Sequence, residues 1–194
     1  MPSIAAHMVC AKIVGEKLEI DDDDFILGNI LPDISSNIDS HNKIEGRYFY
    51  IPNIDYWKKK LDYSNNLNKG YLCHLLLDKY FLEYFIPNNI DSFKTIFETG
   101  IIYEDYSAIN SKLVKDFKIN VDKVICIINN TNYNVDKNKK EKNICHILQK
   151  KCAQTKKIDY DLFANFLYEI SNKIAKELGE LENDKCSKLR IYTR

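Results

Sequence analysis

"GYLCHLLLDKYF", residues 70–81, is the most apolar helical stretch of the chain, yet it contains a histidine and an aspartate. His74 and Asp78 are four residues apart, so on a helix their β-carbons lie about 5–6 Å apart on one face. Only Lys79 and Glu83 form an obvious solvent-facing stripe, so Asp78 points inward or toward a cleft. A buried, unpaired carboxylate is strongly unfavourable, so a neighbouring side chain, His74 itself or a metal ion must satisfy Asp78.

Helical periodicity extends outward from this stretch over most of the chain. Apolar residues recur at spacings of three and four, and no segment shows sustained period-two alternation. The segments predicted to be helical are residues 3–15 with Ser3 as N-cap, the "FILGNIL" run after Asp21–Asp24, a helix from Ile54, residues 67–85 ended by "IPNN", and residues 91–117, 121–130, 140–155 and 159–183. Residues 33–53 are predicted to be irregular. The prediction is an all-α fold of about seven to eight helices in one domain, residues 1–194.

Composition limits the setting and the partners. The chain has 194 residues, 45% of them hydrophobic, which is enough to bury a substantial core. Lys plus Arg and Asp plus Glu both number 28, so no net charge favours a nucleic-acid partner. No secretory signal and no membrane-spanning run is recognisable, and the six cysteines are scattered without a Cys-x-x-Cys motif. We expect a cytoplasmic protein with no membrane span and no nucleic-acid partner, and the sequence leaves its oligomeric state open.

A lysine-rich tract lies near the C-terminal end. Residues 137–157 hold eight lysines and one acidic residue, Glu141. Such a tract could form a basic face beside a phosphate-bearing surface, or it could be a solvated face and a turn.

Three further polar residues are candidates to join His74 and Asp78 in a metal site. His7 lies on the apolar stripe of the first predicted helix, Asp33 follows a proline in a turn, and His41 lies in a polar loop. Imidazole and carboxylate ligands together suit zinc, iron or manganese, which need three or four protein ligands. Asp33, His41, His74 and Asp78 would supply four, with His7 available for a second ion. Each residue also has a simpler explanation. His7 could be a core histidine, Asp33 a turn residue and His41 an exposed residue, and His74 could form a hydrogen bond with Asp78 alone.

The order of these residues along the chain matches a known pattern. His7 lies in an N-terminal helix, "GNILPD" ends at Asp33, "SH" ends at His41, and "GYLCHLLLD" follows. This order resembles the zinc-dependent phospholipase C family, most closely its small bacterial members, and is strongest over residues 1–110. The resemblance implies an all-helical domain with a metal cluster between helices. It also implies hydrolysis of a phosphodiester, such as a phospholipid, by a metal-activated water.

The resemblance also implies a role for each residue. One ion would be held by Asp33, His41, His74 and Asp78. Asp78 would bridge to a second ion, which His7 also binds. Asp33 would double as the general base that takes the proton from the attacking water.

The chain departs from the family pattern at the third metal ion. The secreted members use an N-terminal tryptophan and a downstream His-x-x-x-Glu helix, whereas this sequence begins Met-Pro-Ser and its last histidine, His146, is followed four residues on by Lys150. We therefore expect one or two ions, zinc or else iron or manganese. Asp105 in "YEDYS" and His146 are the candidates for an additional ligand, although an aspartate in this context is also a common turn or cap residue.

The sequence thus predicts a metal-dependent hydrolase that acts on a phosphoester. The alternative is a non-catalytic metal-binding helical protein that keeps the same ligands, and a closed coordination shell would favour it. A third class is a module that binds an acidic partner through residues 137–157. An HD-type phosphohydrolase is the nearest enzymatic competitor, but it requires an adjacent His-Asp pair and no such dipeptide occurs. No glycine-rich phosphate loop is present either.

Overall fold

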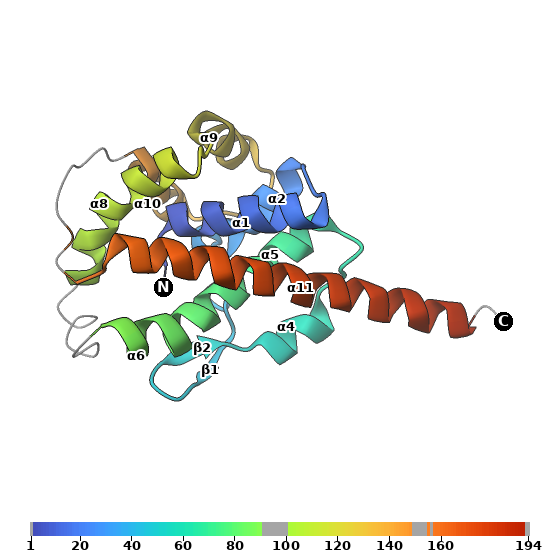
Figure 1. The fold of residues 1–194 in the computed structure, drawn as a ribbon. Helices are drawn as coiled ribbons and strands as arrows, with labels where there is room; N and C mark the ends of the chain where they lie inside the picture. Colours follow the sequence, from blue (N-terminus) through green and yellow to red (C-terminus); the bar gives the residue numbers. More distant parts are fainter. Residues whose placement is uncertain (1, 91–100, 149–154, 156, 193–194) are drawn as a thin grey trace.

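The computed structural model describes residues 2–90, 101–148, 155 and 157–192, and it is mostly helical (Figure 1). In chain order the elements are α1 (Ile4–Leu18), α2 (Asp23–Gly28), α3 (Leu31–Ile34), β1 (Lys43–Glu45), β2 (Tyr50–Pro52), α4 (Ile54–Lys60), α5 (Asn66–Tyr80), the π-helical turn η1 (Phe81–Phe85), α6 (Ile86–Asn89), α8 (Ile101–Asp116), α9 (Val121–Asn130), α10 (Lys137–Leu148) and α11 (Tyr160–Tyr192). The prediction of a helical fold is confirmed, with the addition of one small antiparallel hairpin, β1–β2.

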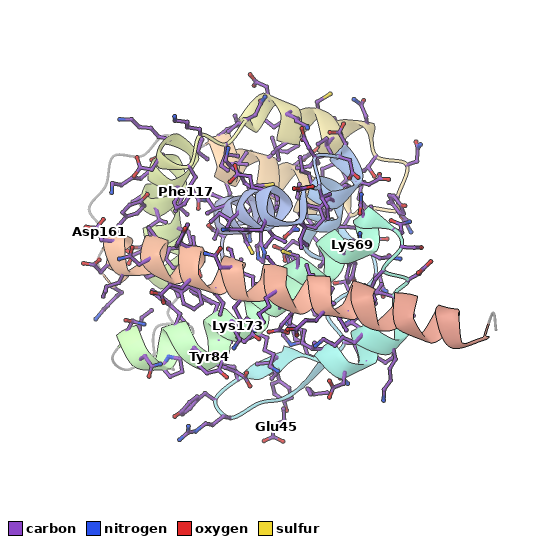
Figure 2. All side chains as sticks on the ribbon, turned by 45° about the vertical axis from the view of Figure 1, so that its right-hand side comes forward. Glu45, Lys69, Tyr84, Phe117, Asp161 and Lys173 are labelled. Atoms are coloured by element: carbon purple, nitrogen blue, oxygen red, sulfur yellow. The ribbon has the colours of Figure 1, made fainter. Side chains whose placement is uncertain are left out.

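Helix α5 occupies the centre of the molecule. Helices α1, α2 and α11 all pack against it, and α11 also packs along α1. Figure 1 shows α11 running across α1 and α5, with its C-terminal end extending beyond the rest of the fold. Lys173 of α11 lies beside Tyr84 of η1 in Figure 2, and its ammonium is 4.3 Å from the ring centre of Tyr80. No helix in the described part of the chain is long and apolar enough to cross a membrane.

Helix α1 begins where the sequence predicts and ends later. The Ser3 hydroxyl accepts the backbone N–H of Ala6, which confirms Ser3 as the N-cap. The predicted end at Gly15 is wrong, because the helix continues to Leu18 and closes on Glu19, which has a φ of 56° and bonds back to the Gly15 carbonyl. Gly15 is needed for another reason: a β-carbon there would lie 2.8 Å from the carbonyl oxygen of Ile20.

Helices α2 and α5 cross with their backbones in contact. Asp22 caps α2 by accepting the N–H of Phe25, as expected for the run of aspartates. A β-carbon at Gly28 would overlap the carbonyl of Leu67, and one at Gly70 would overlap the carbonyl of Phe25. These two glycines therefore allow the end of α2 to approach α5 one turn before His74.

The predicted last residue of the central helix, Phe85, is four residues too early, because "IPNN" is itself helical. Helical structure continues from α5 through η1 into α6, which ends at Asn89. Pro87 lies in the first turn of α6, directly after the π-helical turn η1. The last helix likewise runs further than predicted, to Tyr192. The start of the predicted 91–117 helix and the end of the 140–155 helix lie outside the described residues.

The hairpin lies inside the segment that was predicted to be irregular. Each strand has three residues, and all of β1 is exposed, so the sequence shows no period-two alternation that could reveal it. Ile51 and Pro52 of β2 are buried and attach the hairpin to the fold. The hairpin follows His41 directly and so fixes where the loop containing His41 ends.

Candidate metal centre

Five polar side chains meet between α1, α3 and α5. They are His7, Asp33, His41, His74 and Asp78, the same residues that the sequence singled out. They form two overlapping groups that could hold a metal ion: one contains His7, His74 and Asp78, and the other contains Asp33, His41 and His74. The prediction that a His/Asp cluster capable of holding metal lies between helices is confirmed.

His74 is oriented by α2. Its Nδ1 lies 2.8 Å from the backbone carbonyl oxygen of Asn29, which can only accept, so Nδ1 carries a proton and donates it. In the neutral ring Nε2 is then the unprotonated nitrogen. Nε2 points at the other members of the cluster, as the nitrogen of a metal-ligating histidine does.

His41 is oriented in the same way by a different partner. The Ser40 hydroxyl donates to the carbonyl of Pro32 at 2.9 Å, so its oxygen accepts from Nδ1 of His41 at 3.0 Å. Nε2 of His41 therefore also faces the cluster. It lies 3.3 Å from Nε2 of His74, so two lone pairs would oppose each other unless a proton or a metal ion lies between them.

Asp78 contacts both groups with its two oxygens. Oδ1 lies 3.4 Å from Nε2 of His7, and Oδ2 lies 3.2 Å from Nε2 of His41 and 3.6 Å from Nε2 of His74. The side chain is 0% exposed, and neither oxygen makes a hydrogen bond to any described residue. A carboxylate so placed requires a cation close by.

His7 stacks on His74. The ring centres are 3.8 Å apart and the planes differ by 8°. Neither ring nitrogen of His7 makes a hydrogen bond within the described part of the chain, although the side chain is buried. A buried imidazole usually has at least one partner, so His7 is the second unsatisfied member of the cluster.

The electrostatics favour a proton on His74 when no metal is bound. Burial lowers the pKa of His74, but the charges of Asp78 and Asp33 outweigh it and raise that pKa to about 9. Burial and the charge of His74 lower the pKa of His7. Burial raises the pKa of Asp78, yet the positive charge of His74 and the close approach of the three histidine side chains bring it well below its usual range. Either an imidazolium at His74 or a metal ion can thus neutralise Asp78.

The two groups differ in their access to solvent. Asp33 is 16% exposed, and Asp33 and His41 line a pocket of about 360 Å³. The rest of its lining consists of residues next to them and one from α10: Pro32, Ile38, Asp39, Ser40, Asn42, Lys43 and Lys139. His7 and Asp78, by contrast, are at most 1% exposed. The Asp33 side of the cluster can therefore meet a solute, whereas the His7 side is closed.

Asp105 and His146, the candidates for an additional ligand, lie outside both groups. The Asp105 carboxylate accepts the backbone N–H groups of Lys157 and Ile158 at 2.7 and 2.8 Å, so it holds the chain just before α11. His146 is half-buried on α10, and its carbonyl accepts from the Asn110 side chain.

Comparison with known proteins finds no matching family model, no matching curated protein and no matching solved structure. The resemblance to the zinc-dependent phospholipase C family stays a prediction, and functional assignment rests on the geometry of the cluster.

Four residues that support the cluster were not predicted. Asn29 and Ser40 set the tautomers of His74 and His41, and both occur in the quoted "GNILPD" and "SH" motifs. Trp57 donates its indole N–H to the carbonyl of His41 at 3.2 Å, and Tyr71 donates its hydroxyl to the carbonyl of Ser40. The first two had a sequence signal in their position beside the ligands. The two aromatic residues had none, because their partners are backbone atoms of a distant loop.

Proposed function

We propose that this protein is a metal-dependent phosphoester hydrolase, as the resemblance to the zinc-dependent phospholipase C family implies. One observation carries the proposal: the Nε2 atoms of His41 and His74 converge with Asp33 beside a solvent-accessible pocket. Oδ1 of Asp33 lies 3.8 Å from each Nε2, and the two Nε2 atoms lie 3.3 Å apart. Three such ligands leave coordination positions open toward the pocket, which is characteristic of catalytic sites.

The residues present fit a metal ion. The donor set combines imidazole nitrogens with carboxylate oxygens, which suits zinc, iron or manganese. The unsatisfied atoms of Asp78 and His7 support the same conclusion, because a cation would satisfy both. Asp33, His41 and His74 would hold one ion, and His7 with Asp78 would hold a second, with His74 and Asp78 touching both groups. A divalent ion held there supplies Lewis-acid chemistry, which polarises a phosphoester and makes water more acidic.

The side chains of this protein would position the reactants and move a proton. Asp33 is the carboxylate of the cluster that reaches the pocket, so it is placed to take the proton from an attacking water. The water oxygen forms a bond to phosphorus while the bond from phosphorus to the alcohol oxygen breaks. The alcohol oxygen leaves with the electron pair and receives a proton, and Asp33 is regenerated. Ser40 and the Asn29 carbonyl keep the two histidines in the required orientation throughout.

The second candidate function is metal binding without turnover. The observation that favours it is the complete burial of His7, His74 and Asp78. A closed group of this kind is typical of structural metal sites. The two candidates share the cluster and differ in whether the pocket at Asp33 is used for catalysis.

The deciding experiment is elemental mass spectrometry on protein purified without a polyhistidine tag, followed by a screen of phosphoester substrates. We expect about one or two equivalents of zinc, iron or manganese in the wild-type protein. His74→Gln should lose most of this metal, because His74 belongs to both groups. The matched control is His146→Gln, which removes a histidine outside the cluster and should leave the metal content unchanged.

The outcomes separate the candidates. Bound metal with phosphoester hydrolysis supports the hydrolase. Bound metal with no hydrolysis of any phosphoester tested supports the metal-binding protein. A folded protein that neither contains nor takes up metal would contradict both, and His74 and Asp78 would then be a buried ion pair.

A further inference from the structure

Two lysines border the pocket that Asp33 and His41 line. Lys43 is the first residue of β1, and Lys139 lies in the first turn of α10. Lys139 belongs to the lysine-rich tract at residues 137–157, almost a hundred residues beyond His41 in the chain. The proposed hydrolysis does not yet assign a role to either lysine.

Backbone pairing holds Lys139 at this pocket. The N–H of Asp136 donates to the carbonyl of Ile34 at 2.8 Å, and Ser35 pairs with Val135 in an isolated antiparallel bridge. The ammonium of Lys139 then donates to the carbonyl of Ser35 at 2.9 Å. Ser35 is two residues beyond Asp33, so the start of α10 is fixed against the turn that carries the proposed base.

The pocket suits a compact anion better than a lipid. Among the described residues, its apolar lining consists of Pro32 and Ile38, and Ile38 is 97% exposed, so this part of the chain offers an acyl chain no buried apolar channel at the pocket. The charged lining consists of two lysines and two carboxylates, Asp33 and Asp39. A cation bound by Asp33 would neutralise that carboxylate. The positive charges of the two lysines would then exceed the single negative charge of Asp39. A volume of about 360 Å³ is that of a small-molecule site.

We infer that the substrate is a small, water-soluble phosphomonoester whose dianionic phosphate is bound by Lys139 and Lys43. This inference rests on the proposed hydrolase function and goes further by naming the substrate class. A phosphomonoester carries about two negative charges near neutral pH, as a phosphorylated side chain does. A phosphodiester carries a single charge. The two lysines that line the pocket therefore favour the monoester. Hydrolysis places the water oxygen on phosphorus, breaks the bond to the alcohol oxygen, and yields inorganic phosphate and the alcohol.

The test uses the metal-loaded full-length protein with 4-nitrophenyl phosphate, bis(4-nitrophenyl) phosphate and phosphatidylcholine vesicles. We expect the monoester to have the highest kcat/KM. Lys139→Gln should raise KM for the monoester about tenfold, as expected for loss of a charge-assisted hydrogen bond, and change the diester by less than about twofold. Lys43→Gln should act in the same direction. Metal content should be the same in every variant, because neither lysine is a ligand.

Two control variants separate substrate binding from structure. Lys137→Gln removes a lysine from the same turn of α10; its side chain is 86% exposed and pairs with Glu141 at 3.9 Å, so no change is expected. Lys139→Arg keeps the positive charge and should restore most of the affinity for the monoester.

Each other result would overturn the inference. If the diester or the vesicles are the better substrate, the proposed hydrolase stands and the substrate class is wrong. If Lys139→Gln behaves like Lys137→Gln on the monoester, the lysine does not bind the phosphate. If the metal-loaded wild type hydrolyses no phosphoester, the proposed function and the inference fail together.

Discussion

Ser40 has one hydroxyl proton, and the structure directs it to the carbonyl of Pro32. The oxygen of Ser40 is therefore left as an acceptor for Nδ1 of His41, and this fixes the ring with Nε2 toward the cluster. Partners of this kind commonly raise metal affinity by about 10–100-fold. We expect Ser40→Ala to weaken metal binding by a factor in this range, measured by competition with a chromophoric chelator.

Ser36→Ala is the matched control for that measurement. The Ser36 hydroxyl also donates to a backbone carbonyl, that of Asn134, but it contacts no histidine. Its removal should leave metal affinity unchanged. Equal affinities for the Ser40→Ala variant and the wild type would show that the hydroxyl does not orient His41.

His74 links metal binding to pH. In the metal-free protein Asp78 and Asp33 raise the pKa of His74 to about 9, so at pH 7 this residue carries a proton that a metal must displace. The pKa of His7 is lowered by burial, so His7 has no proton to lose there. We therefore predict about one proton released from His74 per metal bound at pH 7, declining above pH 9, with affinity rising between these values.

Isothermal titration in two non-chelating buffers that differ in ionisation enthalpy measures this release. The heat of metal binding should differ between the buffers at pH 7 and converge as the pH passes 9. Identical heats at pH 7 would mean that His74 is already neutral in the metal-free protein.

Among individual residues, the sequence predicted which side chains would meet but not which atoms. His74 and Asp78 were recognisable because two polar residues one helical turn apart interrupt a run of leucines. His7 was recognisable from its position on an apolar stripe. The tautomers of His41 and His74 were not, because they depend on the Ser40 hydroxyl and the Asn29 carbonyl, whose positions are set by tertiary structure. For the same reason Asp105 could not be distinguished in advance from a ligand.

Among the secondary-structure elements, the crossing of α2 and α5 determines how the site is built. A methyl group at Gly70 would overlap the carbonyl of Phe25, a backbone atom that cannot move aside without shifting α2. Because α2 leads directly to Asn29, such a shift would separate the Asn29 carbonyl from His74. We expect Gly70→Ala to lower the free energy of unfolding by about 1–3 kcal/mol, the usual effect of overpacking. The same variant should bind metal more weakly.

Gly179→Ala in α11 is the comparison for this prediction, made by urea unfolding of both variants. A β-carbon at Gly179 would meet only the side chain of Leu18 at 3.6 Å, an ordinary contact. Replacing a mid-helix glycine by alanine there should raise stability by about 0.5–1 kcal/mol. If the free energy of unfolding falls for Gly70→Ala and rises for Gly179→Ala, Gly70 is needed for the close crossing. Changes of the same sign in the two variants would contradict this.

The ends of the elements were predicted less well than their existence. Gly15 and Pro87 both looked like helix ends, yet α1 continues past Gly15 to Leu18 and α6 continues past Pro87 to Asn89. The hairpin was missed because strands of three residues, largely exposed, carry no periodic signal. In each case tertiary contacts decided the outcome and local propensity did not.

For the molecule as a whole, the site and its support come from different parts of the chain. All five cluster residues lie within the first 78 positions, and this compact order made them visible in the sequence. The later helices hold them in place: α8 packs on α1, and α11 packs on both α1 and α5. The start of α10 adds Lys139 to the rim of the pocket. That last contribution could not be predicted, because nothing in the sequence indicates that Val135 and Asp136, just before the lysine-rich tract, pair with Ser35 and Ile34.

A metal that joins α1, α3 and α5 should stabilise the entire fold, because a ligand that binds only the folded state shifts the unfolding equilibrium. At free metal of 100 times Kd the gain is about 2.7 kcal/mol. For a domain of this size that corresponds to about 5–10 °C in Tm. We expect the Tm of the wild type to fall by this amount when an excess of chelator is added, and to recover when zinc is restored, as followed by circular dichroism.

His146→Gln should show the same response. Asp78→Asn should show little or none, because it removes the negative charge that faces both groups of the cluster. A wild-type Tm that is insensitive to chelator and to added zinc would instead assign the neutralisation of Asp78 to a proton on His74.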